Sequence, residues 1–336
     1  MKLLLTFLAS ILFINLQAQT LHTHLPERAI DFPDIPGYFT LKADLHQHTV
    51  FSDGSVWPDI RVEEAIRDGL DVVSMTDHLE YQPHKADIPH PDRNRSFEVA
   101  TNSAKNSNLI VVNGSEITRS MPPGHANAIF ITDANKLLLD DPEDVFQEAH
   151  NQGAFVFWNH PNWTPQASDG IARLDKMHKK LIKIGHLNGI EVVNETTYSE
   201  EALQIALDNN LTIMGTSDIH GLIDWKFEVP EGGHRPVTLI FAKERTEASV
   251  KEALFARRTA VWHNNTLIGR EEMLKPLITS SVTIKPNATY IGKTEVLKVE
   301  LVNDSDAEFI LYNKSGYTFH VNDDVIMLEP HSVTTI

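Results

Sequence analysis

The sequence predicts an α/β fold, in which a barrel of strand–helix units precedes a small antiparallel β-domain. Between residues 41 and 265, short apolar runs alternate with amphipathic segments of helical period, which is typical of parallel strands with helices outside them. Beyond about residue 276, short apolar runs are separated only by Asn, Asp, Gly and Pro turns. We therefore expect a large domain over residues 41–272 and a β-sandwich-like domain over residues 276–336.

The first units show how the elements are recognised. The apolar alternation of residues 41–46 predicts a strand, and Pro58 opens an expected helix with Gly69 as its C-cap. After a second strand over residues 71–75, residues 79–95 form a polar loop that is long for a plain connection, which suggests a function. The other expected helices span residues 97–105, 142–153, 171–184, 199–209 and 246–257, and the other strands 109–113, 127–132, 154–158, 189–194, 211–215, 237–242 and 259–263. About seven units fit, slightly fewer than in a regular eight-unit barrel.

The β-domain is expected to be entirely antiparallel. Its strands are predicted over residues 282–284, 296–302, 308–312, 317–321 and 325–328, and no helix is expected after Pro276. The sequence indicates no chemistry in this part of the chain.

Composition limits the possible functions. The 336 residues, of which 41% are hydrophobic, suffice for one large and one small domain. With 29 basic against 46 acidic residues, the net charge is −17, which argues against binding nucleic acid or an anionic membrane through the general field of the protein. The chain has 17 histidines and no cysteine, so any metal ion must be held by nitrogen and oxygen ligands.

The N-terminus has the pattern of a secretory signal peptide. A basic Lys2 precedes an apolar run from Leu3 to Leu16 and a small residue, Ala18. The run is shorter than the roughly 20 residues that span a bilayer, and no later stretch reads as a membrane span. We therefore expect a signal peptide over residues 1–18, export to the periplasm or the medium, and an extended lead-in over residues 19–40.

Histidine and acidic residues gather at the ends of the expected strands. His46 and His48 end the first strand, and residues two apart in a strand point to one side, so both imidazoles can hold one metal ion. A lone histidine is more often an ordinary core or surface residue. Chance, however, does not place a histidine or an acidic residue at the end of most strands, and the carboxyl ends of the strands are where barrels build their active sites. The candidate ligands are His46, His48, Asp53, His78, Glu116, His160, Asp218 and His220, joined less neatly by His125, which precedes its strand.

These residues lie in motifs that resemble those of the PHP (polymerase and histidinol phosphatase) family. The motifs are Asp44-Leu45-His46-Gln47-His48-Thr49 with Ser52-Asp53-Gly54, Thr76-Asp77-His78, and Ser217-Asp218-Ile219-His220, and they are joined by Glu116, His125 and His160. The resemblance covers about residues 40–265 and fills every ligand position. It implies a distorted (β/α)7 barrel with up to three divalent metal ions, for which these ligands suit Zn, Mn or Fe.

The resemblance also implies how the ligands are shared. The first ion would be held by His46, His48, Glu116 and Asp218, and Glu116 would bridge to a second ion held by His125 and His160. The third ion would be held by Asp53, His78 and His220. Three carboxylate ligands against three divalent ions leave the site at about +3, which favours an anionic substrate.

Longer strings resemble a secreted phosphodiesterase branch of the family. They are Phe32–Tyr38, Thr118–His125, Phe157–Pro161 and Asn265–Arg270. The resemblance implies a metal-dependent phosphoesterase, a phosphodiesterase before a phosphomonoesterase, that uses a metal-bridging hydroxide on a small-molecule phosphoester.

Further residues are expected around the ligands. Arg119 is the main candidate for a catalytic phosphate clamp, and Asp77 would orient a ligand histidine or act as a general acid. Further phosphate contacts would come from Lys85, Arg93 and Arg95, and the organic part of the substrate would contact Tyr81 and His84, with Trp158 and Trp163 as candidates for either lining or packing. For each of the charged residues the alternative is ordinary surface charge.

Three other functions stay open. A phosphomonoesterase of the histidinol-phosphatase type fits the ligands, but the expected signal peptide argues against a biosynthetic enzyme. A two-metal amidohydrolase usually needs a bridging lysine, and no lysine ends an expected strand. A secreted metal-binding or adhesion module would not need so complete a ligand set. The natural substrate, the metal and the oligomeric state do not follow from the sequence.

Overall fold

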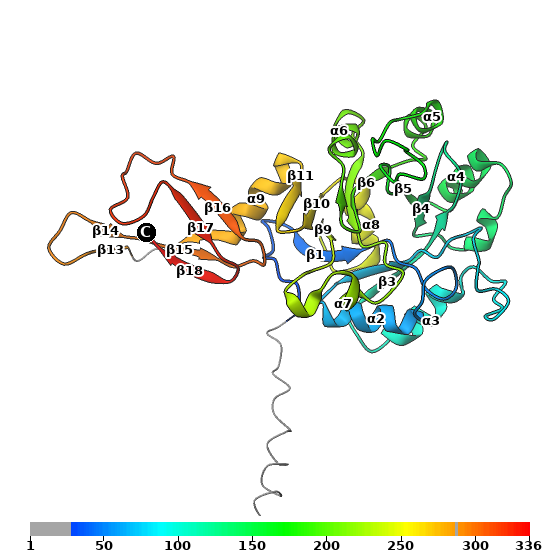
Figure 1. The fold of residues 1–336 in the computed structure, drawn as a ribbon, viewed down its shortest axis with the longest axis horizontal. Helices are drawn as coiled ribbons and strands as arrows, with labels where there is room; N and C mark the ends of the chain where they lie inside the picture. Colours follow the sequence, from blue (N-terminus) through cyan, green and yellow to red (C-terminus); the bar gives the residue numbers. More distant parts are fainter. Residues whose placement is uncertain (1–27, 286–287) are drawn as a thin grey trace, which may run out of the picture.

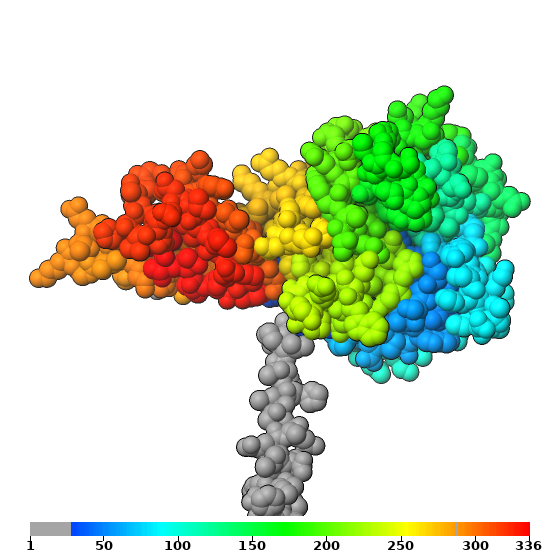
Figure 2. All heavy atoms as spheres, in the orientation of Figure 1, coloured from blue at the N-terminus to red at the C-terminus, as the bar shows by residue number. Residues whose placement is uncertain are grey.

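The computed structural model describes residues 28–285 and 288–336, so the expected signal peptide lies outside the described residues. Figure 1 shows a large domain, coloured blue to yellow, and a small orange-to-red domain that follows α9 (Glu271–Ser281). The small domain projects from one side of the large one (Figure 2). Within the described ranges, no helix combines the length and the apolar character needed to cross a membrane.

The strands of the large domain form one curled, 11-stranded sheet in the order β11-β10-β9-β1-β2-β3-β4-β5-β6-β7, with β8 paired to β6. The strands are β1 (Phe39–Asp44), β2 (Val72–Met75), β3 (Ile110–Ile117), β4 (Ala126–Ile129), β5 (Phe155–Trp158), β6 (Gly189–Asn194), β7 (Thr197–Tyr198), β8 (Thr212–Thr216), β9 (Val237–Ala242), β10 (Thr259–His263) and β11 (Thr266–Gly269). The other helices are α2 (Pro58–Arg67), α3 (Arg95–Ala104), α4 (Pro142–Asn151), α5 (Lys176–Lys183), α6 (Glu200–Asp208), α7 (Ile223–Lys226) and α8 (Glu247–Phe255), with two short 3₁₀ turns at Ala134–Leu137 and Val229–Glu231.

The sheet confirms the expected distorted barrel, but it is mixed rather than wholly parallel. Strands β1, β2 and β3 are parallel, as are β5, β6 and β8. Strand β4 runs against both β3 and β5, and β9 runs against both β1 and β10. The loop from β3 to β4 contains no crossover helix, and an antiparallel neighbour needs none.

The barrel closes between β8 and the β9–β10 pair through side chains. Thr238 Oγ1 accepts a hydrogen bond from Gly215 N at 3.0 Å and donates one to Gly215 O at 2.8 Å, while Thr259 Oγ1 donates to Ile213 O at 2.8 Å. A Cβ at Gly215 would lie 2.2 Å from Val261 Cγ1, so only glycine permits this approach. Threonine hydroxyl groups thus replace a backbone ladder between β8 and the β9–β10 pair.

Element boundaries differ from the expected ones at two places that matter. Strand β3 continues to Ile117, so Glu116 lies inside the strand rather than beyond it. The helix expected from residue 171 begins only at Lys176, because Asp175 accepts a hydrogen bond from Met177 N and forms a capping box with His178.

The secondary structure that follows Pro276 also differs from the expected one. Helix α9 continues through Pro276 to Ser281, whereas no helix was expected after this proline. Leu277, on the same turn, is fully buried, and this burial offsets the helix hydrogen bond that proline lacks. The domain is antiparallel as expected, with strands β12 (Val282–Ile284), β13 (Thr289–Tyr290), β14 (Leu297–Lys298), β15 (Glu300–Asn303), β16 (Phe309–Tyr312), β17 (Val325–Leu328) and β18 (Ser332–Thr335). Residues 317–321 form no strand.

One apolar cluster joins the two domains to the lead-in. Phe32 of the lead-in packs edge-on against Trp262 of β10, with 5.3 Å between the ring centroids. Leu301 and Phe309 of the C-terminal domain belong to the same buried cluster. The described part of the lead-in is therefore a component of the core rather than a free segment.

Candidate metal centre

The nine expected ligands converge at one mouth of the barrel. Their positions follow from the strands: His46 and His48 follow β1, and Asp53 lies in the next turn. The others follow β2 (His78), lie in β3 (Glu116), precede β4 (His125), or follow β5 (His160) and β8 (Asp218 and His220). Residues from six strand ends, up to 174 positions apart in the chain, thus meet at one place.

Glu116 lies at the centre of this group and is fully buried. Its Oε1 lies 3.1 Å from His125 Nδ1, 3.4 Å from His160 Nε2 and 3.5 Å from His46 Nε2. Its Oε2 lies 2.5 Å from His78 Nδ1 and 3.6 Å from His48 Nε2. One carboxylate therefore faces five imidazoles, which is the geometry expected of a bridging ligand.

A second carboxylate, that of Asp218, faces the first pair of histidines. Asp218 Oδ1 lies 3.1 Å from His46 Nε2 and 3.0 Å from His48 Nε2, and these two nitrogens are 3.1 Å apart. Within the described structure, the buried atoms Asp218 Oδ1 and Glu116 Oε2 lie close to imidazole nitrogens of other expected ligands, but none of these contacts has the geometry of a hydrogen bond. Buried donor atoms without partners that all point at one small space fit a bound cation.

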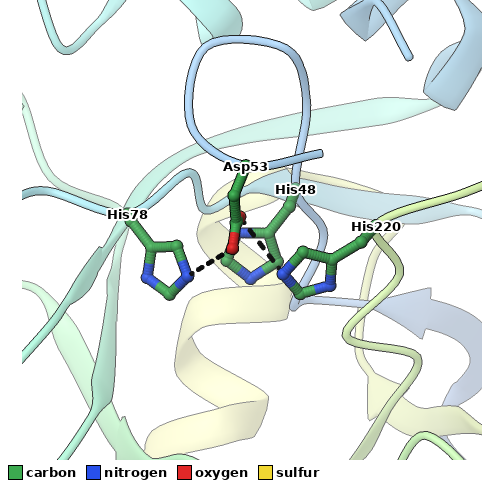
Figure 3. Close-up of side chains that lie close together, drawn as sticks. All are labelled: His48, Asp53, His78 and His220. Atoms are coloured by element: carbon green, nitrogen blue, oxygen red, sulfur yellow. Dashed lines mark ion pairs between the residues drawn. The ribbon is translucent and has the colours of Figure 1, made fainter. Parts of the chain in front are cut away.

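The outer part of the cluster is arranged around Asp53 (Figure 3). The carboxylate lies between two rings, 3.4 Å from His78 Nε2 and 3.2 Å from His220 Nε2, and is 3.6 Å from His48 Nδ1. The His48 and His220 rings stack with centroids 4.2 Å apart. His48 therefore connects this outer group to the inner one.

Seven of the nine expected ligands fall into three overlapping groups whose ligand atoms lie within 4.8 Å of one another. The groups are His48–Asp53–His78–His220, His46–His48–Glu116 and His78–Glu116–His125. Because they share His48, His78 and Glu116, they form one continuous cluster of nitrogen and oxygen donors. This donor set fits first-row divalent metals such as Zn, Mn or Fe.

Burial and neighbouring charge shift the pKa values of the histidines strongly. Burial opposes charge on His46, but the carboxylates of Asp218 and Glu191 outweigh it and raise the pKa of His46 well above its usual value. Burial likewise opposes charge on His78, yet Glu116 and Asp53 raise its pKa to about 10. Burial and the positive charge of its neighbours lower the pKa of His48 to about 4. Without metal, protons on selected histidines balance the buried carboxylates.

One solved protein structure matches almost the whole chain. It is a two-domain protein from Bacteroides vulgatus, described as containing a predicted PHP-like metal-dependent phosphoesterase, with 44% identity and a TM-score of 0.85. The match covers 91% of this chain and 88% of that chain. The chain belongs to the family of PHP-like metal-dependent phosphoesterases. In addition, residues 282–336 match a family model of an Ig-like domain.

Two more distant solved structures match about half of the chain. A putative metal-dependent phosphoesterase from Bifidobacterium adolescentis is 19% identical, covers 54% of this chain and 88% of its own, and has a TM-score of 0.40. An amidohydrolase from Chromobacterium violaceum, with bound sulfate and no metal, is 15% identical, covers 53% and 87%, and also has a TM-score of 0.40. No curated protein matches the chain.

Asp77 supports the turn that carries ligands in this PHP-like protein. Its Oδ1 accepts hydrogen bonds from Thr49 N and Ser52 Oγ, both at 2.7 Å, and its Oδ2 accepts one from Thr49 Oγ1 at 2.8 Å. Ser52 Oγ in turn lies 3.3 Å from His48 Nδ1. These contacts favour the orienting role expected for Asp77 over that of a general acid.

The arginines expected to clamp phosphate are engaged with protein groups. Arg119 Nε lies 2.9 Å from Glu80 Oε1, and its two terminal nitrogens donate to the carbonyl oxygens of residues 139 and 140. Arg93 donates to carbonyl groups of its own loop, and Arg95 pairs with a glutamate of α3. Because the guanidinium groups of Arg119, Arg93 and Arg95 contact carbonyl and carboxylate oxygens of the protein, the contacts favour bracing of the loops. Lys85 is exposed and His84 half-exposed on the same loop.

Two exposed aromatic rings rest against ligand histidines. Tyr81 is 51% exposed and meets His78 edge-on, with 5.7 Å between centroids. Trp163 is 44% exposed and lies 5.6 Å from the ring of His125 and 5.1 Å from that of His160. Trp158 is instead buried in the core, where it stacks on His178.

Sequence reasoning missed Glu191, a fully buried residue of β6 that contacts the ligand His46. The available signal was a single acid within the apolar run Ile190–Val193. A carboxylate in a strand that is otherwise apolar is expected to have buried partners, because an unpaired buried charge is costly.

Metal binding to the metal-free protein is expected to release protons near neutral pH. The raised pKa values of His46 and His78 mean that both are protonated there, and a metal ion needs neutral imidazole. The apparent affinity for metal should therefore rise as the pH rises toward these pKa values.

The release of protons can be measured with a pH indicator when Zn²⁺ or Mn²⁺ is added to the protein in weakly buffered solution. His46→Ala is the comparison and should release fewer protons per metal ion bound. Binding without any release would contradict the charge balance described here.

Proposed function

We propose that this protein is a phosphodiesterase whose substrate phosphate binds at the metal centre. Membership of the metal-dependent phosphoesterases supports the hydrolysis of a phosphoester. The convergence of the nine expected ligand side chains, with the buried Glu116 at their centre, is the observation that carries the proposal, because it gathers nitrogen and oxygen donors at one mouth of the barrel.

The chain's own residues would hold the metal and orient the substrate. Divalent ions in such a site supply Lewis-acid charge and activate water for attack at neutral pH. His46, His48 and Asp218 would bind on the inner side, Asp53, His78 and His220 on the outer side, and Glu116 between them. The loaded site is locally positive inside a protein of net charge −17, so it would attract an anionic group that the rest of the surface repels.

Preference for a diester is supported by room for organic groups beside the centre. A cavity of about 560 Å³ adjoins His125 and is lined by Trp163, Met121, Ser120 and Arg119, among others. Tyr81 offers a second exposed ring against His78. A diester carries an organic group on each of two phosphate oxygens, and aromatic faces bind such groups well, whereas a monoester has only one.

The arginine contacts support the same preference. A phosphomonoester carries up to two negative charges and profits from cationic clamps beyond the metal. In the described structure, Arg119 and Arg93 donate to backbone carbonyl groups, and Arg95 is paired with a carboxylate. The phosphomonoesterase function is therefore the second candidate.

Side-by-side kinetics with Mn²⁺ or Zn²⁺ test this proposal. A bis-aryl phosphate should be hydrolysed with a kcat/KM at least about tenfold above that of the aryl monophosphate, which corresponds to about 1.4 kcal/mol from the second organic group. His46→Ala and Asp218→Ala should abolish turnover while circular dichroism shows a retained fold. Preference for the monoester would reject the diester assignment, and turnover by either variant would reject the assigned metal ligands.

The contribution of Trp163 can be measured separately. Trp163→Ala should raise KM for a bis-aryl phosphate about three- to tenfold, because the aryl group loses a stacking surface. Trp225→Ala is the matched control, since this tryptophan of α7 is 80% exposed and is not among the aromatic rings that contact the ligand histidines. An unchanged KM in the Trp163 variant would show that the organic group binds elsewhere.

A further inference from the structure

Glu191 is a buried carboxylate that contacts the metal centre without being one of the expected ligands. Its side chain is fully buried and accepts four hydrogen bonds. Oε1 accepts from His46 Nδ1 at 2.8 Å and from Thr216 Oγ1 at 2.6 Å. Oε2 accepts from His160 N at 2.7 Å and from Asn194 Nδ2 at 2.9 Å. Both oxygens are thus satisfied, as a buried charge requires.

The contact with His46 determines which ring nitrogen can bind metal. An ionised carboxylate can only accept, so His46 Nδ1 carries the proton in this hydrogen bond. The neutral ring then has its lone pair on Nε2, the atom that faces Asp218 Oδ1 at 3.1 Å and Glu116 Oε1 at 3.5 Å. Histidine ligands of metals generally donate their second nitrogen to such a partner, which fixes the tautomer and the ring orientation.

Two other ligands are tied to the same carboxylate. The hydrogen bond from His160 N fixes the backbone of that ligand directly. Asn194 Nδ2, which donates to Glu191, also lies 3.2 Å from Asp218 Oδ2. Ligands that follow three different strands, β1, β5 and β8, are therefore connected through two side chains of β6, those of Glu191 and Asn194.

The backbone of β6 is irregular at the place where this side chain is needed. The register between β6 and β8 shifts between Glu191 and Val193. In a regular strand, residues three apart point to opposite faces, so Glu191 and Asn194 would not meet. A β-bulge re-aims side chains and is common beside active sites. Here it accompanies the contact between Glu191 and Asn194.

We infer that Glu191 is a positioning residue that orients His46, His160 and Asp218 for metal binding. This inference rests on the metal centre of the proposed function and is independent of the diester preference. Replacing a residue that only stabilises the fold would lower the stability of the protein. Replacing a positioning residue would also lower the affinity for metal.

Glu191→Gln in the full chain tests the inference. Glutamine keeps the size of the side chain but has only one acceptor oxygen, so its NH2 group must face some of the donors that Glu191 accepts from. If this NH2 group donates to His46 Nδ1, the proton of the neutral ring moves to Nε2, the nitrogen that would bind metal. Titration of Zn²⁺ or Mn²⁺ against a fluorescent chelator should show metal binding about 10- to 100-fold weaker than in the wild type. Because this readout needs no substrate, it is separate from any failure of the phosphodiesterase assay.

Two further variants keep the test decisive. Val145→Ala removes methyl groups from a fully buried residue of α4, so it should lower the melting temperature without changing the affinity for metal. If Glu191→Gln does not fold, Glu191→Asp retains the charge at a shorter reach and should also bind metal more weakly. Wild-type affinity in whichever Glu191 variant folds would overturn the inference, as would an equal loss of affinity in Val145→Ala.

Discussion

The packing of buried carboxylates against imidazoles at one mouth of the barrel is the constraint on which the rest of the structure depends. Glu116 and Asp218 are buried and face histidine nitrogens at 2.5–3.6 Å. Such a concentration of charge is stable only when protons or metal ions balance it. The barrel must therefore hold the ligands rigidly while it leaves their donor atoms without other partners.

A second layer of buried charge holds the ligand loops from behind. Arg235 pairs with Asp44, the carboxylate two residues before His46, at 3.1 Å. Asp44 also accepts hydrogen bonds from Ser217, the residue before Asp218, so the first and last ligand segments are fixed to each other. Together with the contacts made by Glu191, these pairs explain how a distorted barrel, closed partly by threonine side chains, still positions its ligands.

Much of this centre could be predicted from the sequence, because each ligand carries a local signal. His46 and His48 end an apolar strand at a spacing of two, and this pattern survives any error in strand boundaries. The role of Glu191 could not be predicted, since its partner His46 lies 145 positions away. The engagement of Arg119 was equally hidden, because its partners are backbone carbonyl oxygens that no side-chain pattern records. The continuation of α9 through Pro276 depends on tertiary burial rather than on local propensity.

Anomalous diffraction from crystals grown with Mn²⁺ or Zn²⁺ tests the central claim most directly. Strong peaks should lie among His46, His48, Glu116 and Asp218, and between Asp53, His78 and His220, at about 2.0–2.3 Å from their nitrogen and oxygen atoms. Crystals of catalytically active protein with metal bound only elsewhere, or with no metal among these side chains, would contradict it.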